Sequence, residues 1–435
     1  MTAPINLIRT KLLPASLFLY SIAILTTMAG MEIFGWLTFL LISIVAIFDR
    51  KKGVWILRRP LLETGDWALL SLMTVIILSA FIAAPQEADK LFIVGNARFV
   101  MLFLGMRFSL EAVTDRAGAP AVEKAFRFLL VLIGVTSIYA ISQHFNGIDY
   151  IRGHRDPITK YVFQGGSTFR SRGMWGHPVT FGHSMALSFS MIFGYAVSRN
   201  KFDKWKAIGI GVSVLSATAI LWSYTRGAWI AIAAAVAIMV LFLGRKIAIS
   251  VYSGSVALLV GAFFASEEFR QRLASVVSTT DLSNVQRIDI WKANIAMFKD
   301  HPIFGVGYGF NEDLITAYYE KLGITQEFGG HAHNNYLQFL SGTGILGFAA
   351  YTAFTGIFLW MSIKLLRTVK KGTATYGLVL GALGAQVALL VGGLTECNFK
   401  DAEVNHQFMF ICALVMLIWR ANSLDTNSRA NLGRA

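Results

Sequence analysis

Hydrophobic residues occur along this chain in long blocks that are separated by short polar stretches. Blocks of about 17–25 apolar residues have the length of a helix that crosses a bilayer. We find twelve: 12–29, 32–48, 66–84, 92–108, 126–144, 178–198, 206–222, 227–243, 247–264, 341–363, 374–394 and 404–420. They predict an all-α polytopic integral membrane protein in which residues 1–435 form a single membrane domain. The first block lacks a small-residue cleavage site, so we expect a retained span rather than a signal peptide.

Composition and charge refine this prediction. Hydrophobic residues make up 55% of the 435 and charged residues only 15%, against about 25% in soluble domains. If both termini are cytoplasmic, the loops on that side hold most of the 39 lysines and arginines and a minority of the 25 acidic residues. This distribution follows the positive-inside rule. The net charge of +14 therefore indicates topology and contact with membrane lipids, and it does not point to nucleic acid as a partner.

Two long stretches, 145–177 and 265–340, then lie on the outer, periplasmic side. The second separates the ninth and tenth spans and contains amphipathic segments. One of them predicts a helix, with Ser283 and Gln286 as a capping box and Pro302 at its end. The apolar stripe of this helix is Val285, Ile288, Trp291, Ile295 and Phe298.

The sequence "GVGYGF", residues 305–310, supplies glycines for a tight turn after this helix. A nucleotide-binding loop would require a strand before it, and none is predicted. The two cysteines, Cys397 and Cys412, give no reason to expect a disulfide or a metal site.

Two arginines stand where positive charge is unfavourable. Arg226 opens the eighth span at its outer end, and Arg287 lies in the first turn after Ser283. Helix N-termini disfavour cations, and the outer side of a membrane protein carries few of them. A bound anion would explain both positions, because helix N-termini and arginines each bind phosphate. The alternative is that each arginine snorkels or pairs with a carboxylate, for which Asp289 and Glu403 are candidates.

The segment "HAHNNYLQF", residues 331–339, brings titratable and amide side chains to the same outer face. Histidine titrates near neutral pH, so one of the two could act as a general base. Residues two apart on a helix point about 200° apart, so we do not expect His331 and His333 to share a metal ion. The alternative is a capping and hydrogen-bonding cluster without chemistry. No D-x-D motif is present, and the site is predicted to need neither a metal nor a cofactor.

Four stretches together resemble the O-antigen ligase and polymerase superfamily of bacterial envelope enzymes. "SYTRGAWIA" is similar to its arginine-bearing span opening, and "QRIDIWKANIAMFKDHPIFGVGYGF" to its R-x-x-x-W…HP-x-x-G-x-G segment. "HAHNNYLQFLSGTGILGF" resembles its H-N-x-Y-L…G-x-x-G segment, and "GMWGHPVTFGHSMAL" an earlier one. The similarity runs from about residue 165 to residue 400.

Within the superfamily, the size and the number of spans look like those of O-antigen ligases (WaaL type), which are similar in architecture to GT-C glycosyltransferases. The resemblance implies transfer of O-antigen polysaccharide from undecaprenyl diphosphate to a lipid A–core sugar, at the periplasmic face of the bacterial inner membrane. It implies that Arg226 and Arg287 bind the diphosphate and that His333 is the general base of an inverting, metal-independent reaction.

Further residues on the outer face are candidates for orienting a substrate, each with a structural role as the alternative: Arg172, His177, His331, Asn334, Tyr336 and Glu396. Arg98, in the fourth span, is an intramembrane charge, which by default indicates a functional site near lipid or acceptor phosphates.

Other functions remain open at this stage. An O-antigen polymerase would use the same donor, with another lipid-linked glycan as acceptor. A protein-glycosylating oligosaccharyltransferase of the superfamily is a further alternative. A transporter of lipid-linked glycans should show paired broken spans and charge at the bilayer midplane, whereas the polar clusters here lie at the outer edge.

Overall fold

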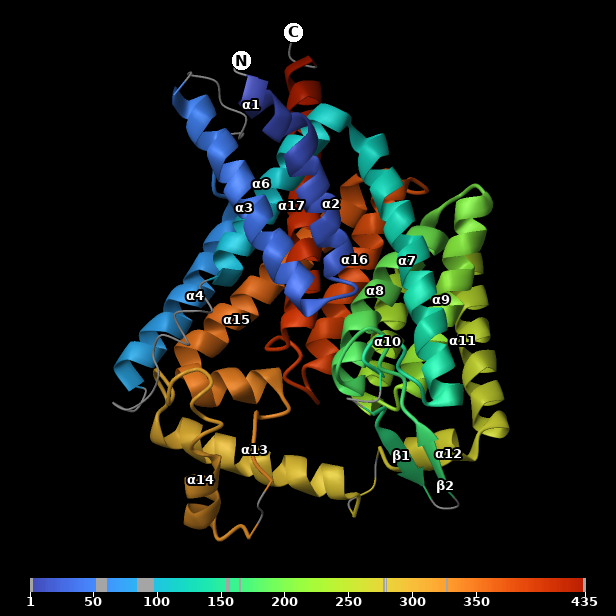
Figure 1. Ribbon diagram of the computed structural model, residues 1–435, viewed down its shortest axis with the longest axis vertical. Helices are drawn as coiled ribbons and strands as arrows, with labels where there is room; N and C mark the ends of the chain where they lie inside the picture. The colour runs from blue at the N-terminus through green and yellow to red at the C-terminus, as the bar shows by residue number, and fades with distance from the viewer. Residues whose placement is uncertain are drawn as a thin grey trace.

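The computed structural model describes residues 3–51, 61–83, 98–153, 157–163, 166–276, 278, 280–325 and 328–432. It is an elongated bundle of helices (Figure 1). The first helix, α1, and the end of the last, α17, lie at one end of the bundle. The opposite end carries α12, α13, α14 and a small hairpin of strands β1 and β2 (Figure 1). We call it the site end.

Among the described residues, eight helices are long and apolar enough to cross a membrane. They are α3 (Met28–Lys51), α4 (Thr64–Ala83), α7 (Ala119–Asn146), α9 (Lys204–Trp222), α11 (Arg245–Ala265), α15 (Asn335–Thr368), α16 (Ala374–Gly392) and α17 (Ala402–Leu432). Shorter or more polar helices complete the bundle: α1 (Ala3–Leu7), the π-helical turn η1 (Ile8–Leu12), α2 (Leu13–Ala23), α6 (Arg98–Ala117), α8 (Pro178–Ser198) and α10 (Arg226–Val240).

The prediction of a helical membrane protein is confirmed, and helices cover most of the described residues of the twelve predicted spans. The first predicted span, 12–29, is not one helix: α2 ends at Ala23, and α3 begins at Met28 after a turn. Residue 84 of the third span and residues 92–97 of the fourth lie outside the described residues. The count of twelve spans stays a prediction, since eight helices meet the requirements of length and apolarity. The fold also contains a hairpin that was not predicted, formed by β1 (Lys160–Phe163) and the antiparallel β2 (Gly166–Phe169).

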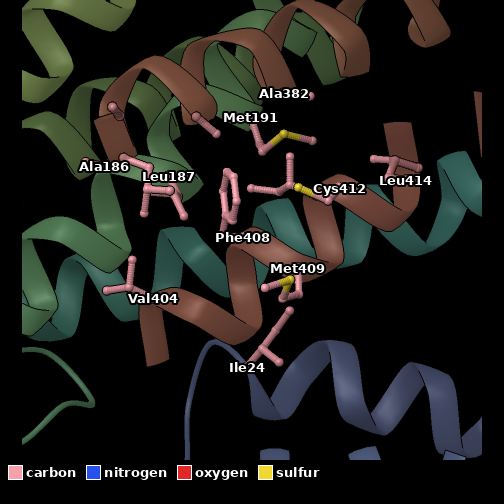
Figure 2. Packing of buried hydrophobic residues seen from close by; sticks show 14 of the residues in the cluster. Ile24, Ala186, Leu187, Met191, Ala382, Val404, Phe408, Met409, Cys412 and Leu414 are labelled. Carbon is pink, nitrogen blue, oxygen red and sulfur yellow. The ribbon is translucent and has the colours of Figure 1, made fainter. Parts of the chain in front are cut away.

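The core of the bundle lies between α8, α16 and α17. Helix α8 packs against α16, and α17 packs against both. Phe408 and Cys412 of α17 lie among Leu187 and Met191 of α8 and Ala382 of α16 (Figure 2). Cys412 and Cys397 are both buried, free thiols. In contrast, α11 has no buried residue, and its main contacts are with α10 and α12.

The site end is built by α12 (Glu267–Ala274), α13 (Leu282–Asp300) and α14 (Ile315–Leu322). Helix α13 confirms the predicted helix, and it ends just before Pro302. Two details of the prediction are wrong. Asp281 is the N-cap, accepting from the backbone N–H of Asn284, so Ser283 is not the cap.

The buried face of α13 is also not the predicted apolar stripe. Val285, Ile288 and Ile295 are exposed, whereas the buried side chains belong to Ile290, Ala293, Asn294 and Met297. This face packs on the segments around α14 and α15, where Asn294 accepts a hydrogen bond from Asn311.

The glycine-rich turn after α13 packs on a break in α15. Gly344 has φ 65° and ψ −164°, and the helix changes direction there (Figure 1). The N–H of Val306 donates to the carbonyl of Ser341, and that of Ile345 to the carbonyl of Pro302. A Cβ on Gly305 would lie 2.4 Å from Ser341 O, so only glycine permits this approach. The glycines therefore join α13 to α15, and no described strand precedes them as a nucleotide loop would require.

Candidate active site

The site is centred on a buried carboxylate, Glu396, in the loop between α16 and α17. The Nδ1–H of His333 donates to its Oε1 at 2.9 Å, and its Oε2 lies at 3.1 Å. Nε2 of His331 lies 3.4 Å from Oε1, and the guanidinium of Arg287 lies 3.7 Å from Oε2. One carboxylate thus contacts two imidazoles and one guanidinium.

Two asparagines fix this geometry by tying the start of α15 to the loop that carries Glu396. Asn334 caps α15 by accepting from the N–H of Leu337, while its Nδ2 donates to the carbonyl of Leu394. The N–H of Asn335 donates to the carbonyl of Gly393. The backbone of His333 has φ 46°, a conformation that is uncommon for residues other than glycine. The "HAHNN" segment therefore holds its histidines over Glu396 by specific hydrogen bonds.

The expectation that the two histidines point apart is wrong. Their ring centroids are 4.2 Å apart, because α15 begins only at Asn335 and the histidines precede the helix. His331, His333 and Glu396 offer ligand atoms within 4.8 Å of one another, so this group could hold a metal ion. The guanidinium of Arg287 beside the carboxylate disfavours a second cation there.

Electrostatics in this cluster favour an ionised carboxylate. Burial raises the pKa of Glu396, but the hydrogen bond from His333 and the charges of His333, His331 and Arg287 bring it down to about 2. Burial lowers the pKa of His331, and the carboxylate opposes this effect. Burial also lowers the pKa of Arg287. Because Glu396 is ionised, the Nδ1 of His333 carries a proton and its Nε2 is free to accept one.

Arg226 begins α10 and has a different partner. Its Nη2 lies 3.2 Å from Oδ1 of Asp281, and its Nη1 donates to the carbonyl of Ser275 at 2.6 Å. Arg226 and Arg287 thus both pair with carboxylates, Arg226 with Asp281 and Arg287 with Glu396. The partners expected from the sequence, Asp289 and Glu403, are not used. Asp289 pairs with Lys292 instead, and Glu403 forms no ion pair with a described residue.

Other candidates lie around the cluster or apart from it. Arg172 is buried and bound by Asp149 through Nε and Nη2. His177 is the N-cap of α8, and partial desolvation of its ring together with the charge of Arg170 lowers its pKa. Tyr336 donates to the carbonyl of Leu390.

Arg98 belongs to another group. It is the first residue of α6, where it is half-exposed and lies 3.5 Å from Glu32. Its guanidinium also stacks over the ring of Phe99. Arg98 therefore has a carboxylate partner and does not contact the Glu396 cluster.

Two basic residues near the site were not singled out from the sequence. The Nε of Arg170 donates to the carbonyl of Ser223, and the Nε of Arg272 to the carbonyl of Tyr224. Both carbonyls belong to the turn just before Arg226. No local pattern marks these arginines, because one follows the unpredicted hairpin and the other lies in a short charged helix.

The fold and the site describe a helical membrane protein that has a carboxylate–histidine pair, Glu396 and His333, and several arginines at one end of its bundle. Such an arrangement can accept a proton and bind an anion at the same place.

Residues 211–352 of the chain match the protein family described as O-antigen ligase. A search of curated proteins found no match. The family match confirms the resemblance to the O-antigen ligase superfamily, and this family implies an enzyme of the glycosyltransferase kind that acts on lipid-linked glycans. The matched range includes Arg226, Arg287 and His333 and ends before Glu396.

Proposed function

We propose that the protein is an O-antigen ligase. It transfers O-antigen from undecaprenyl diphosphate to a sugar of lipid A–core, at the periplasmic face of the bacterial inner membrane and with both termini in the cytoplasm. The observation that carries this proposal is the Glu396–His333 pair, with Arg287 on the same carboxylate. The family match and the apolar helices support it.

The reaction is a single displacement at the anomeric carbon. The acceptor hydroxyl gives its proton to Nε2 of His333 while its oxygen attacks the carbon, and the bond from that carbon to the diphosphate oxygen breaks. Glu396 holds the imidazole and stabilises the imidazolium that forms. The negative charge that develops on the leaving diphosphate is stabilised by Arg287 and Arg226. Because attack and departure occur on opposite faces, the configuration inverts.

We expect the arginines to perform the charge stabilisation that a divalent cation performs in many phosphate-transfer enzymes. His331 lies beside Glu396, and the charges of Glu396 and His333 act on His177, so both histidines are proposed to orient the acceptor. Arg172 is proposed to hold the segment 145–177 in place through its ion pair with Asp149. Asn334 and Tyr336 are proposed to position α15. Arg98 is proposed to contact lipid.

The test is reconstitution of the reaction from purified components. The protein, undecaprenyl-diphosphate-linked glycan and lipid A–core are incubated with EDTA and without nucleotide, and the product is separated on a gel. A ladder of glycan on lipid A–core is expected, and His333→Ala should reduce its rate by about 10²–10⁴-fold. His301→Ala, at the C-cap of α13, is the matched control. Lengthened lipid-linked glycan without transfer to lipid A–core would instead indicate a polymerase.

A further inference from the structure

Three arginines from distant parts of the chain converge on one turn, residues 223–226. Consecutive carbonyls of this turn, at Ser223 and Tyr224, accept hydrogen bonds from Arg170 at 2.8 Å and Arg272 at 3.0 Å. Arg226 follows directly and begins α10. Nη2 of Arg170 also donates to Oγ1 of Thr225 at 3.4 Å. Arg272 donates to the turn through its Nε alone, so its terminal nitrogens remain available to a ligand.

The charges of this group are not balanced within the protein. Arg226 pairs with Asp281, which is also the N-cap of α13. Neither Arg170 nor Arg272 has a carboxylate within ion-pair distance among the described residues. Burial and the charges of Arg272 and Arg226 lower the pKa of Arg170 to about 10. Three cations thus share one carboxylate, a surplus that a doubly charged anion would neutralise.

The geometry of the turn favours an anion further. The side chain of Thr225, the N-cap of α10, accepts no hydrogen bond from the first backbone N–H groups of this helix, and residues 226–229 are buried. Tyr161 holds Arg272 in place, since the guanidinium lies 5.0 Å from its ring centre and the ring stacks on Tyr224. Oriented guanidinium groups beside a helix N-terminus form a site for phosphate.

We propose that Arg170 and Arg272 bind, together with Arg226, the diphosphate of a polyprenyl lipid. This inference rests on the proposed function and deepens it, by assigning two further donor-binding residues. Arg287, which lies beside Glu396, then stabilises the charge on the leaving oxygen, and the charge of Arg226 acts on both Arg170 and Arg287.

The surroundings of α12 indicate a lipid rather than a soluble diphosphate. Arg272 lies on α12, which follows α11 after a single residue, Ser266. Helix α11 is long and apolar enough to cross a membrane, and none of its residues is buried. Its end nearest α12 exposes large apolar side chains, including Val260 and Phe264. A ligand bound at the arginines would therefore have apolar surface beside it for a hydrocarbon chain.

The experiment measures binding of two probes to the full-length protein in detergent or nanodiscs: farnesyl diphosphate and inorganic pyrophosphate. Arg272→Gln and Arg170→Gln should each weaken binding of farnesyl diphosphate by about 10- to 100-fold, the effect of losing a charged hydrogen-bond donor. Arg270→Gln is the matched control, because Arg270 lies on the same helix and pairs with Glu267 on the surface. It should bind as the unmodified protein does.

Three results would overturn the inference. The first is unchanged binding of farnesyl diphosphate by both glutamine variants. The second is pyrophosphate binding as tight as that of farnesyl diphosphate, which would indicate a site for free phosphate. The third is that Arg272→Gln binds farnesyl diphosphate fully but unfolds at a lower temperature, and that Arg272→Lys restores this temperature. Arg272 would then have a structural role.

The outcome is separable from that of the proposed function. His333→Ala should keep the affinity for farnesyl diphosphate while ligation is lost. If binding depends on Arg170 and Arg272 but no glycan reaches lipid A–core, the lipid site stands and the ligase assignment fails.

Discussion

Replacing Glu396 by glutamine tests whether one carboxylate holds the acid–base cluster together. The substitution keeps the size and an oxygen that can accept from Nδ1 of His333, but it removes the charge shared by His331, His333 and Arg287. The pKa of Glu396 falls from 4.5 to about 2 in the folded protein. At 1.36 kcal/mol per pKa unit, its ionised form contributes about 3 kcal/mol to stability.

The pH dependence of this contribution has a definite sign. Because the folded pKa lies below the unfolded value, the contribution is complete above about pH 4.5 and is lost as the pH falls towards 2. At pH 7, Glu396→Gln should therefore unfold at a temperature about 3 °C lower than the unmodified protein. This value divides the lost free energy by an unfolding entropy of about 2.1 cal/mol/K per residue. At pH 3 the difference should shrink to less than half.

The assay is thermal unfolding of the purified protein in detergent at both pH values, with ligation measured at pH 7. Ligation should fall, but by less than the about 10²–10⁴-fold loss expected on removal of the base, since glutamine still orients the ring. Glu403→Gln is the control, a buried carboxyl at the start of α17 outside the cluster, and it should cost no more than about 1 kcal/mol. An unfolding temperature of Glu396→Gln equal to that of the unmodified protein at pH 7 would refute the reasoning.

Three further changes probe the surroundings of the cluster. Left-handed backbone strain costs about 1–2 kcal/mol, and Gly305→Ala should cost more than this because its Cβ would also meet the backbone of α15. Gly309→Ala is the control, since it brings the strain alone, and thermal unfolding compares the two variants. Asp281→Ala removes the N-cap of α13, a loss of about 0.5–2 kcal/mol in the free energy of unfolding, and it also removes the partner of Arg226. Thermal unfolding should therefore show a loss of stability at least this large. Arg287→Lys keeps the charge but loses the planar fork, so ligation should fall at least tenfold, roughly the loss of one charged hydrogen bond; a fully active lysine variant would argue against a shaped clamp.

The sequence predicts the helices well because a bilayer requires long apolar blocks, and such blocks can be found without knowledge of packing. It is less informative at the site end, where helix starts depend on single side chains. Asp281 and Ser283 both suit an N-cap, and the structure uses the aspartate. The buried face of α13 could not be read from its apolar residues, because that face holds a hydrogen-bonded asparagine, Asn294.

The site residues divide in the same way. Arg226, Arg287 and His333 could be singled out because each violates a local preference or matches a motif. The central position of Glu396 could not, since it depends on a loop contact between segments 63 residues apart, His333 and Glu396. Arg170 and Arg272 were missed because a surplus of positive charge appears only once the fold brings them to one turn.

The two groups of charges at the site end differ in what can change their net charge. In the Glu396 cluster, the carboxylate balances Arg287, and Nε2 of His333 is the proton acceptor in the proposed reaction. In the group at residues 223–226, the cations are arginines and stay charged at any physiological pH, so only a bound anion can balance it. A displacement that releases a proton from one substrate and a diphosphate from the other requires both properties side by side. Burial lowers the pKa of Arg287, the carboxylate of Glu396 opposes this effect, and the charge of Arg226 adds to it, so the two groups lie close enough to influence each other electrostatically.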